Sequence, residues 1–181
     1  MADVLQGRVP AKTIDTGQGT RFFGIAEISG QEPRSLEAGT DLSRAVYLQT
    51  GDIVIALLGD LGKSAVIDDR AAGAVLGREC AALRITQNER LLPSWLHAWT
   101  ESQDFRQQIA RHASGTTMPR VSTRSLADLV LPLPSLSCQQ ELAAKIGQFD
   151  AVLKATEEMV RNLQELRAAE VNLAIAGVRG E

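Results

Sequence analysis

Few residues in this chain carry obvious catalytic or metal-binding chemistry. Cysteine occurs twice, at Cys80 and Cys138, and neither has a second Cys or a His at zinc-ligand spacing. We therefore expect no metal site, and two isolated thiols favour a reducing cytoplasm. Aromatic residues make up only 4% of the 181 residues, against 44% hydrophobic residues overall, so aliphatic side chains must fill the core.

Long apolar runs are also missing. No segment approaches the roughly 18 uninterrupted apolar residues of a membrane span. The N-terminal residues 1–8 contain no apolar core of a signal peptide. We expect a cytoplasmic protein with one domain and an appendage, or at most two small domains.

The residue combinations of common active sites are absent as well. The only histidines are His97 and His112, and the sequence suggests no Ser–His–Asp or Cys–His pairing for either. Asp68-Asp69 lacks the spaced Glu-x-Lys of a metal-dependent nuclease. The Gly-rich cofactor loop and the Asn/Asp-Pro-Pro-aromatic segment of a methyltransferase are also missing. We expect no catalytic residue in this chain.

Residues 59–64, Gly-Asp-Leu-Gly-Lys-Ser, look at first like a phosphate-binding P-loop. That motif needs a glycine five residues before its Gly-Lys-Ser end, where this chain has Leu57. The segment also leads into another predicted strand, so no helix N-terminus is available for a phosphate. A hairpin turn is expected instead, with Lys63 well placed to touch a phosphate from its tip.

Acidic residues are missing from one window. Between Phe105 and Ala127 there is no Asp or Glu, although the formal net charge of the chain is −3. The same window holds Arg106, Arg111, Arg120 and Arg124, and residues 1–136 contain twelve Arg but two Lys. Arginine favours bidentate recognition of phosphate or guanine. A charged surface with Arg favoured by coding bias explains the same pattern, and charge alone leaves both readings open.

The local patterns predict an α+β fold. Strands are expected at 21–28, 51–59, 64–68, 74–77, 80–85 and 129–133, with the second and third forming a hairpin. One helix is expected from Pro93 to about Arg111, and a helical turn near Ser122. Between them, residues 115–120 read Gly-Thr-Thr-Met-Pro-Arg. This segment is either a loop that approaches a ligand closely or a simple connection whose threonines cap the next turn.

The C-terminal part reads as one long helix. Pro132 and Pro134 end the extended segment, and Ser137 with Gln140 forms a capping box that places the helix start at about Cys138. About 38 residues at about 1.5 Å each span nearly 60 Å. A near-heptad seam follows its length, formed by Leu142, Ile146, Phe149, Leu153, Val160 and Leu163. We expect this seam to need a second helix, from another copy or from a partner.

The order of several short motifs resembles the specificity subunit of type I restriction-modification systems. The motifs are Gly51-Asp-Ile-Val-Ile, Gly59-x-x-Gly-Lys63, Leu83-Arg-Ile, Leu92-Pro-x-Trp-Leu96, Gly115-Thr-Thr and Leu129-x-Leu-Pro-Leu-Pro-x-Leu-x-x-Gln-x-Glu-Leu. The resemblance implies a DNA target-recognition domain at 1–136, a conserved-region helix at 137–177 and a tail at 178–181. The usual subunit has two such domains and two helices, whereas this chain has one of each.

The resemblance implies a non-catalytic protein that reads double-stranded DNA. It positions adenine methyltransferase subunits, which bind S-adenosylmethionine, and the family's complexes also include a restriction subunit. Two copies with paired helices would form a homodimeric coiled coil that reads an interrupted palindrome. Pairing with a different half-subunit stays open. Candidate DNA contacts, chosen by charge and loop position, are Arg21, Lys63, Arg106, Thr116, Thr117, Arg120 and Arg124.

Two other functions remain open from the sequence. One is a helix-mediated scaffold or adaptor that never contacts DNA. The other is a nucleic-acid-processing enzyme, such as a nuclease, although the sequence offers it no coherent active site.

Overall fold

The computed structural model describes residues 1–14 and 19–178. It divides into two compact units, Met1–Gln140 and Glu141–Glu181. The first unit contains eight described strands and four short helices, and the long helix α5 (Leu136–Val178) supplies the second. The predicted α+β class is confirmed.

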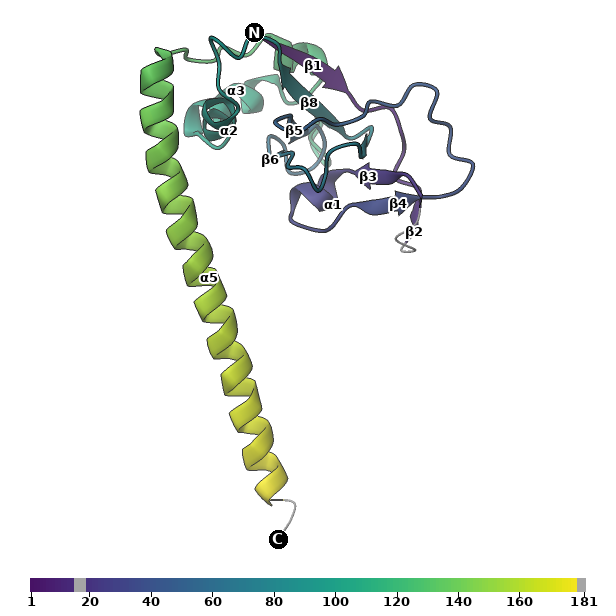
Figure 1. Ribbon diagram of the computed structural model, residues 1–181. Helices are drawn as coiled ribbons and strands as arrows, with labels where there is room; N and C mark the ends of the chain where they lie inside the picture. Colours follow the sequence, from purple (N-terminus) through teal and green to yellow (C-terminus); the bar gives the residue numbers. More distant parts are fainter. Residues whose placement is uncertain (15–18, 179–181) are drawn as a thin grey trace. The chain divides into compact units, whose positions relative to one another are not determined.

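The main sheet of the first unit is antiparallel, in the order β1-β8-β5-β6 (Figure 1). Its strands are β1 (Ala2–Gln6), β8 (Cys80–Ile85), β5 (Ile53–Ala56) and β6 (Ser64–Val66). The predicted hairpin is present, because β5 pairs with β6 from Ile53 opposite Val66 to Ile55 opposite Ser64. Strand β1, which the sequence did not predict, pairs with β8 from Ala2 opposite Ile85 to Gln6 opposite Ala81.

A second, smaller sheet has the order β2-β4-β3-β7. It consists of β2 (Thr13–Ile14), β4 (Arg34–Leu36), β3 (Arg21–Phe23) and β7 (Val75–Leu76). The predicted strand 21–28 is wrong beyond Phe23, where helix α1 (Ile25–Ile28) begins. The Gly24 amide donates to the Glu27 carboxylate over 2.8 Å, and this local bond favours a helical turn over a continued strand.

The main sheet is buried on both faces. On one face Ile53 and Ile55 pack with Phe105 and other side chains of the helical layer, whereas Val54 and Ala56 pack on the other face beneath α1 and β7. The helical layer is α2 (Pro93–Thr100), α3 (Gln103–His112) and α4 (Thr123–Ala127). The period-2 alternation of a strand explains how consecutive apolar residues serve two cores.

The single helix predicted at 93–111 is two helices. α2 ends at Thr100, and Ser102 caps α3 by accepting a hydrogen bond from the Phe105 amide over 3.1 Å. The edge-to-face contact between Trp99 and Phe105, with ring centroids 4.9 Å apart, packs the two helices together. The helical turn predicted near Ser122 is confirmed as α4, with Ser122 as its cap.

The strand predicted at 129–133 is wrong, since this segment pairs with side chains rather than with a strand. The Val130 amide donates to Gln108 Oε1 over 2.8 Å, and Gln108 Nε2 donates back to the Val130 carbonyl over 2.9 Å. Trp95 Nε1 donates to the Pro132 carbonyl over 2.9 Å. The extended backbone is therefore satisfied without joining a sheet.

Helix α5 begins two residues earlier than predicted. Its cap is Ser135, whose hydroxyl accepts from the Cys138 amide over 3.4 Å, so the capping role predicted for Ser137 is wrong. The helix runs for 43 residues to Val178, and residues 179–181 of the predicted tail lie outside the described part. Among the described helices, none is long and apolar enough to cross a membrane.

Candidate nucleic-acid interface

Four chain segments meet where the strands of the main sheet end. The Gly7 amide donates to the Cys80 carbonyl over 3.0 Å, and the Leu57 amide donates to the Glu79 carbonyl over 2.8 Å. The Val121 amide in turn donates to the Leu57 carbonyl over 3.0 Å. These bonds extend the ladder of the main sheet across segments that are distant in sequence. We call this ladder of residues 6–7, 79–80, 57–58 and 120–121 the platform.

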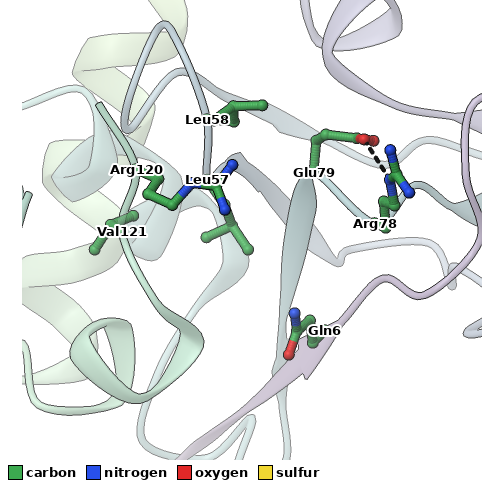
Figure 2. Close-up of a pocket in the computed structure, with 7 residues that line it drawn as sticks. All are labelled: Gln6, Leu57, Leu58, Arg78, Glu79, Arg120 and Val121. Atoms are coloured by element: carbon green, nitrogen blue, oxygen red, sulfur yellow. Dashed lines mark hydrogen bonds and ion pairs between the residues drawn. The ribbon is translucent and has the colours of Figure 1, made fainter. Parts of the chain in front are cut away.

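The platform carries an open cleft with a volume of about 460 Å³. Gln6, Arg78, Glu79 and Arg120 provide its polar lining, and Figure 2 shows the Arg78–Glu79 ion pair among them. A second cleft of about 320 Å³ shares Gln6 and Arg78 with the first. We refer to these two neighbouring hollows together as the arginine cleft.

The second hollow adds Arg8 and Arg44 to the lining. Its one acidic residue is Asp41, whose carboxylate accepts from the Ser43 amide over 2.9 Å. Hydrogen bonds from Ser43, first of all that of its backbone amide, lower the pKa of Asp41, and the nearby Arg44 charge lowers it further. Arg8, Arg44, Arg78 and Arg120 are all exposed, so four guanidinium groups border the two neighbouring hollows. Such an arrangement suits a polyanion.

Two loops predicted to approach a ligand lie side by side at one end of the platform. Ser114 and Arg120 exchange two backbone hydrogen bonds of 2.9 Å each, which closes the loop 115–119. The Gly59 amide of the β5–β6 turn donates to the Pro119 carbonyl over 3.1 Å. Gly62 in that turn has φ +80°, and a Cβ there would lie 3.0 Å from the Phe105 ring. The turn therefore rests directly on α3.

The structure brings several of the predicted contact residues to this region. Thr116 and Thr117 are exposed in the loop 115–119, and Arg120 lines the arginine cleft. Lys63 closes the neighbouring turn, where its ammonium group lies 3.7 Å from Asp60 Oδ2 and donates to Ser29 Oγ over 3.1 Å. Arg106 on α3 and Arg124 on α4 are exposed. Their roles as contacts stay predictions.

Arg21 has a different environment. Its guanidinium donates to the backbone carbonyls of Arg70 and Ala72, so it ties β3 to the turn before β7. Other residues line the cleft although the sequence analysis did not select them as DNA contacts. They are Gln6, Arg8, Arg44, Arg78 and Glu79. These residues come from three separate segments, around positions 6–8, 44 and 78–79, and only the tertiary structure brings the segments together.

The described residues hold no arrangement of three His, Cys, Asp or Glu side chains that could bind a metal ion. Burial raises the pKa of the Cys80 thiol to about 12. A thiol with so high a pKa is a packed core group and a poor nucleophile. His97 lies 3.7 Å from Glu101 on the surface of α2.

The platform and its arginines fit the comparison with known families. A family model described as the type I restriction modification DNA specificity domain matches residues 1–166. The chain belongs to this family. The family description names DNA specificity and no catalytic activity, in agreement with the resemblance noted in the sequence.

Curated specificity subunits are similar over most of the chain. The type I restriction enzyme MjaVIII specificity subunit of Methanocaldococcus jannaschii is 24% identical over 136 residues, which cover 73% of this chain and 32% of that protein. The EcoBI specificity subunit of Escherichia coli is 21% identical over 175 residues, covering 92% of this chain and 36% of that protein. This specificity domain thus spans about a third of the length of these relatives.

A solved structure has the same fold. It comes from work on complex assembly and conformational transition of a type I restriction-modification system, with a TM-score of 0.65 and 22% identity. The match covers 91% of this chain and 41% of the other. The fold of the specificity domain, long helix included, is therefore one already seen in this family.

Proposed function

We propose that this chain reads one half of a bipartite DNA site for a type I restriction-modification complex. The observation that carries the proposal is the family match over residues 1–166, combined with four exposed arginines around the arginine cleft. The guanidinium groups suit phosphates and guanine edges. The chain itself performs no chemistry in this proposal and acts in the cytoplasm.

The proposed complex is a homodimer held together by α5. Apolar side chains are exposed along this helix, among them Phe149 at 70%, Leu153 at 61% and Leu163 at 59%. A twofold axis between two helices would bury these side chains against their own copies. The two recognition domains would then be related by the same axis, so the DNA site would be an interrupted palindrome.

The proposed partners are DNA adenine methyltransferase subunits, which bind S-adenosylmethionine. A restriction subunit is a further possible member of the assembly. The formal net charge of the chain is −3, so outside its basic cleft it attracts the phosphate backbone weakly. This supports an arrangement in which the methyltransferase subunits make part of the phosphate contacts. In this arrangement the chain supplies sequence readout and the methyltransferases supply catalysis.

A methylation map of the native host, with and without the gene for this chain, tests the proposal. We expect adenine methylation to disappear at one interrupted, symmetric motif and to return on complementation. Loss at an asymmetric motif would support DNA reading but replace the homodimer with a pair of different halves. An unchanged map would contradict the proposed function and favour a scaffold that does not contact DNA.

A further inference from the structure

Two acidic side chains, Asp41 and Glu79, stand among the arginines of the cleft, and Glu79 borders the same hollow as Arg78 and Arg120. Glu79 has a side chain that is 23% exposed, and its Oε1 atom lies 2.7 Å from Arg78 Nε. If the cleft receives DNA, as proposed above, this carboxylate faces a polyanion. The ion pair with Arg78 offsets part of the charge, but the second carboxylate oxygen has no hydrogen bond to any described residue. Like charges repel, so the position costs affinity unless the DNA offers this oxygen a hydrogen-bond donor.

Duplex DNA limits where that donor lies. Phosphate oxygens accept hydrogen bonds and donate none, and an ionised carboxylate also only accepts. In the major groove the donors are the exocyclic amino groups of cytosine and adenine. A carboxylate in a DNA-binding cleft is therefore satisfied by base edges and not by the backbone.

The carboxylate is held in place firmly enough to read a base. The backbone carbonyl of Glu79 accepts from the Leu57 amide over 2.8 Å, and the backbone amide of the preceding Arg78 donates to the Val9 carbonyl over 2.9 Å. Gly7 crosses this segment so closely that a Cβ would lie 1.9 Å from the Gly77 carbonyl oxygen. Readout groups on a rigid backbone discriminate better than groups on mobile loops.

Other polar groups around Glu79 are also available to a ligand. Three side-chain groups make no hydrogen bond within residues 1–14 and 19–178: the side-chain amide of Gln6, the guanidinium of Arg120 and the second carboxylate oxygen of Glu79. They border the same hollow (Figure 2). Within the described chain, this hollow thus presents an unpaired carboxylate oxygen and a side-chain amide together with two guanidinium groups, a combination that suits a base edge flanked by phosphates or guanine.

We propose that Glu79 is a specificity-determining residue that accepts a hydrogen bond from the exocyclic amino group of a cytosine or adenine. The proposal rests on the DNA-reading function. Glu79→Gln keeps the shape of the side chain and removes its charge. Because the amide also carries a donor, the variant should lose its preference for an amino-bearing base at one position of the motif.

The test is a methylation map of cells that carry the full-length chain with its methyltransferase and no restriction activity. For Glu79→Gln we expect discrimination at one motif position to fall by roughly 5- to 150-fold. The base that the wild-type motif requires at the relaxed position distinguishes cytosine from adenine. Glu89→Gln, an exposed glutamate beyond the other end of β8, is the matched control and should leave the motif unchanged.

Arg78→Ala separates reading from simple positioning. If Glu79 only orients Arg78, both variants will reduce methylation uniformly with an unchanged motif, and the proposal is overturned. An unchanged map for Glu79→Gln overturns it as well. In either case the wild-type chain still directs methylation, so the DNA-reading function stands. If the wild-type chain directs none, the proposed function itself fails, and the role of Glu79 with it.

Discussion

The residues that carry the family resemblance mostly hold the recognition domain together. Gln139 is fully buried, accepts from the Leu92 amide over 3.0 Å, and donates to the carbonyls of Arg90 and Pro134 over 2.9 Å each. With the bond from Trp95 to Pro132, it joins the Leu-Pro-x-Trp motif to the Pro-Leu-Pro…Gln motif. Two motifs far apart in sequence are therefore one structural joint.

Gln139→Ala should weaken this joint. The substitution leaves a buried amide and two carbonyls without their partner, at a cost of about 1–3 kcal/mol for an orphaned buried group. We expect a lower urea midpoint for unfolding of the recognition domain. Gln140→Ala, at the exposed neighbouring position, is the control and should unfold like the wild type. If the two variants unfold at the same urea midpoint, the hydrogen bonds of Gln139 do not stabilise the recognition domain.

Asp52 and Arg84 connect two further motifs, Gly-Asp-Ile-Val-Ile and Leu-Arg-Ile. Arg84 Nε and Nη2 donate to the two Asp52 carboxylate oxygens over 2.9 Å and 2.7 Å, and Asp52 is 2% exposed. The hydrogen bond to Asp52 raises the pKa of Arg84. Asp52 directly precedes β5 and Arg84 lies in β8, so the pair links the two strands. These motif residues therefore have a structural role in the sheet.

Cys80 should resist thiol reagents. Its pKa is raised from 9.0 to about 12 by burial, so the thiolate hardly forms in the folded protein at pH 8. In a Cys138→Ser variant we expect alkylation of Cys80 only on unfolding. The free energy of unfolding should also fall as pH rises above 9.0, since the unfolded chain loses this proton first. Rapid alkylation of Cys80 in the folded Cys138→Ser protein would contradict the burial of this thiol.

Arg120→Ala tests whether this arginine reads guanine or contacts phosphate. As a guanine reader it should cost about 1–3 kcal/mol and relax one motif position. As a phosphate contact it should weaken binding to all sequences and lower the slope of log K against log salt by about 1. Binding of the chain with its methyltransferase to motif and scrambled duplexes, over a salt series, separates the two. No change in either property would remove Arg120 from the interface.

At the scale of elements, helix α5 has a wider apolar face than the sequence seam indicated. Beside the predicted seam runs a second row seven residues apart, formed by Val152, Met159, Leu166 and Leu173, all exposed. Ile146 of the predicted seam is half-buried, whereas the other predicted members are exposed. Three apolar positions in seven are typical of a helix that packs against more than one neighbour.

Leu153→Glu and Leu166→Glu probe the two rows of α5. A charge placed in a buried helix pair is strongly unfavourable, so Leu153→Glu should yield a monomer in light scattering of the purified chain. If the second row belongs to the same interface, Leu166→Glu should do the same. Gln164→Glu adds the same charge outside both rows and should stay dimeric. A dimeric Leu153→Glu protein would refute the predicted seam.

Local sequence signals predicted some elements well and others poorly. The β5–β6 hairpin was predictable because β-branched and apolar runs flank a glycine turn, and β8 because residues 80–85 form a short apolar run. The segment 129–133 has the same composition, but its backbone is bonded by Gln108 and Trp95. No local pattern reveals that a side chain will take the place of a neighbouring strand.

At the scale of the whole molecule, a twofold dimer has a geometric consequence for DNA. Each recognition domain would meet its half-site in the same orientation relative to the axis. A duplex with two half-sites as an inverted repeat should therefore be methylated by the assembled complex, and the same half-sites as a direct repeat should not. Adenine methylation of the two synthetic duplexes measures this, and equal methylation would exclude the symmetric homodimer.

The sequence by itself determined the family, the α+β class and the long terminal helix. These follow from the order of motifs and from hydrophobic periods, which are properties of neighbouring residues. It also pointed to Arg120 through the window without acids. Only the tertiary structure decided which charges lie around the arginine cleft, because Arg8, Arg44, the Arg78–Glu79 pair and Arg120 come from separate segments. Backbone hydrogen bonds between distant segments build the platform, and no short-range pattern encodes them.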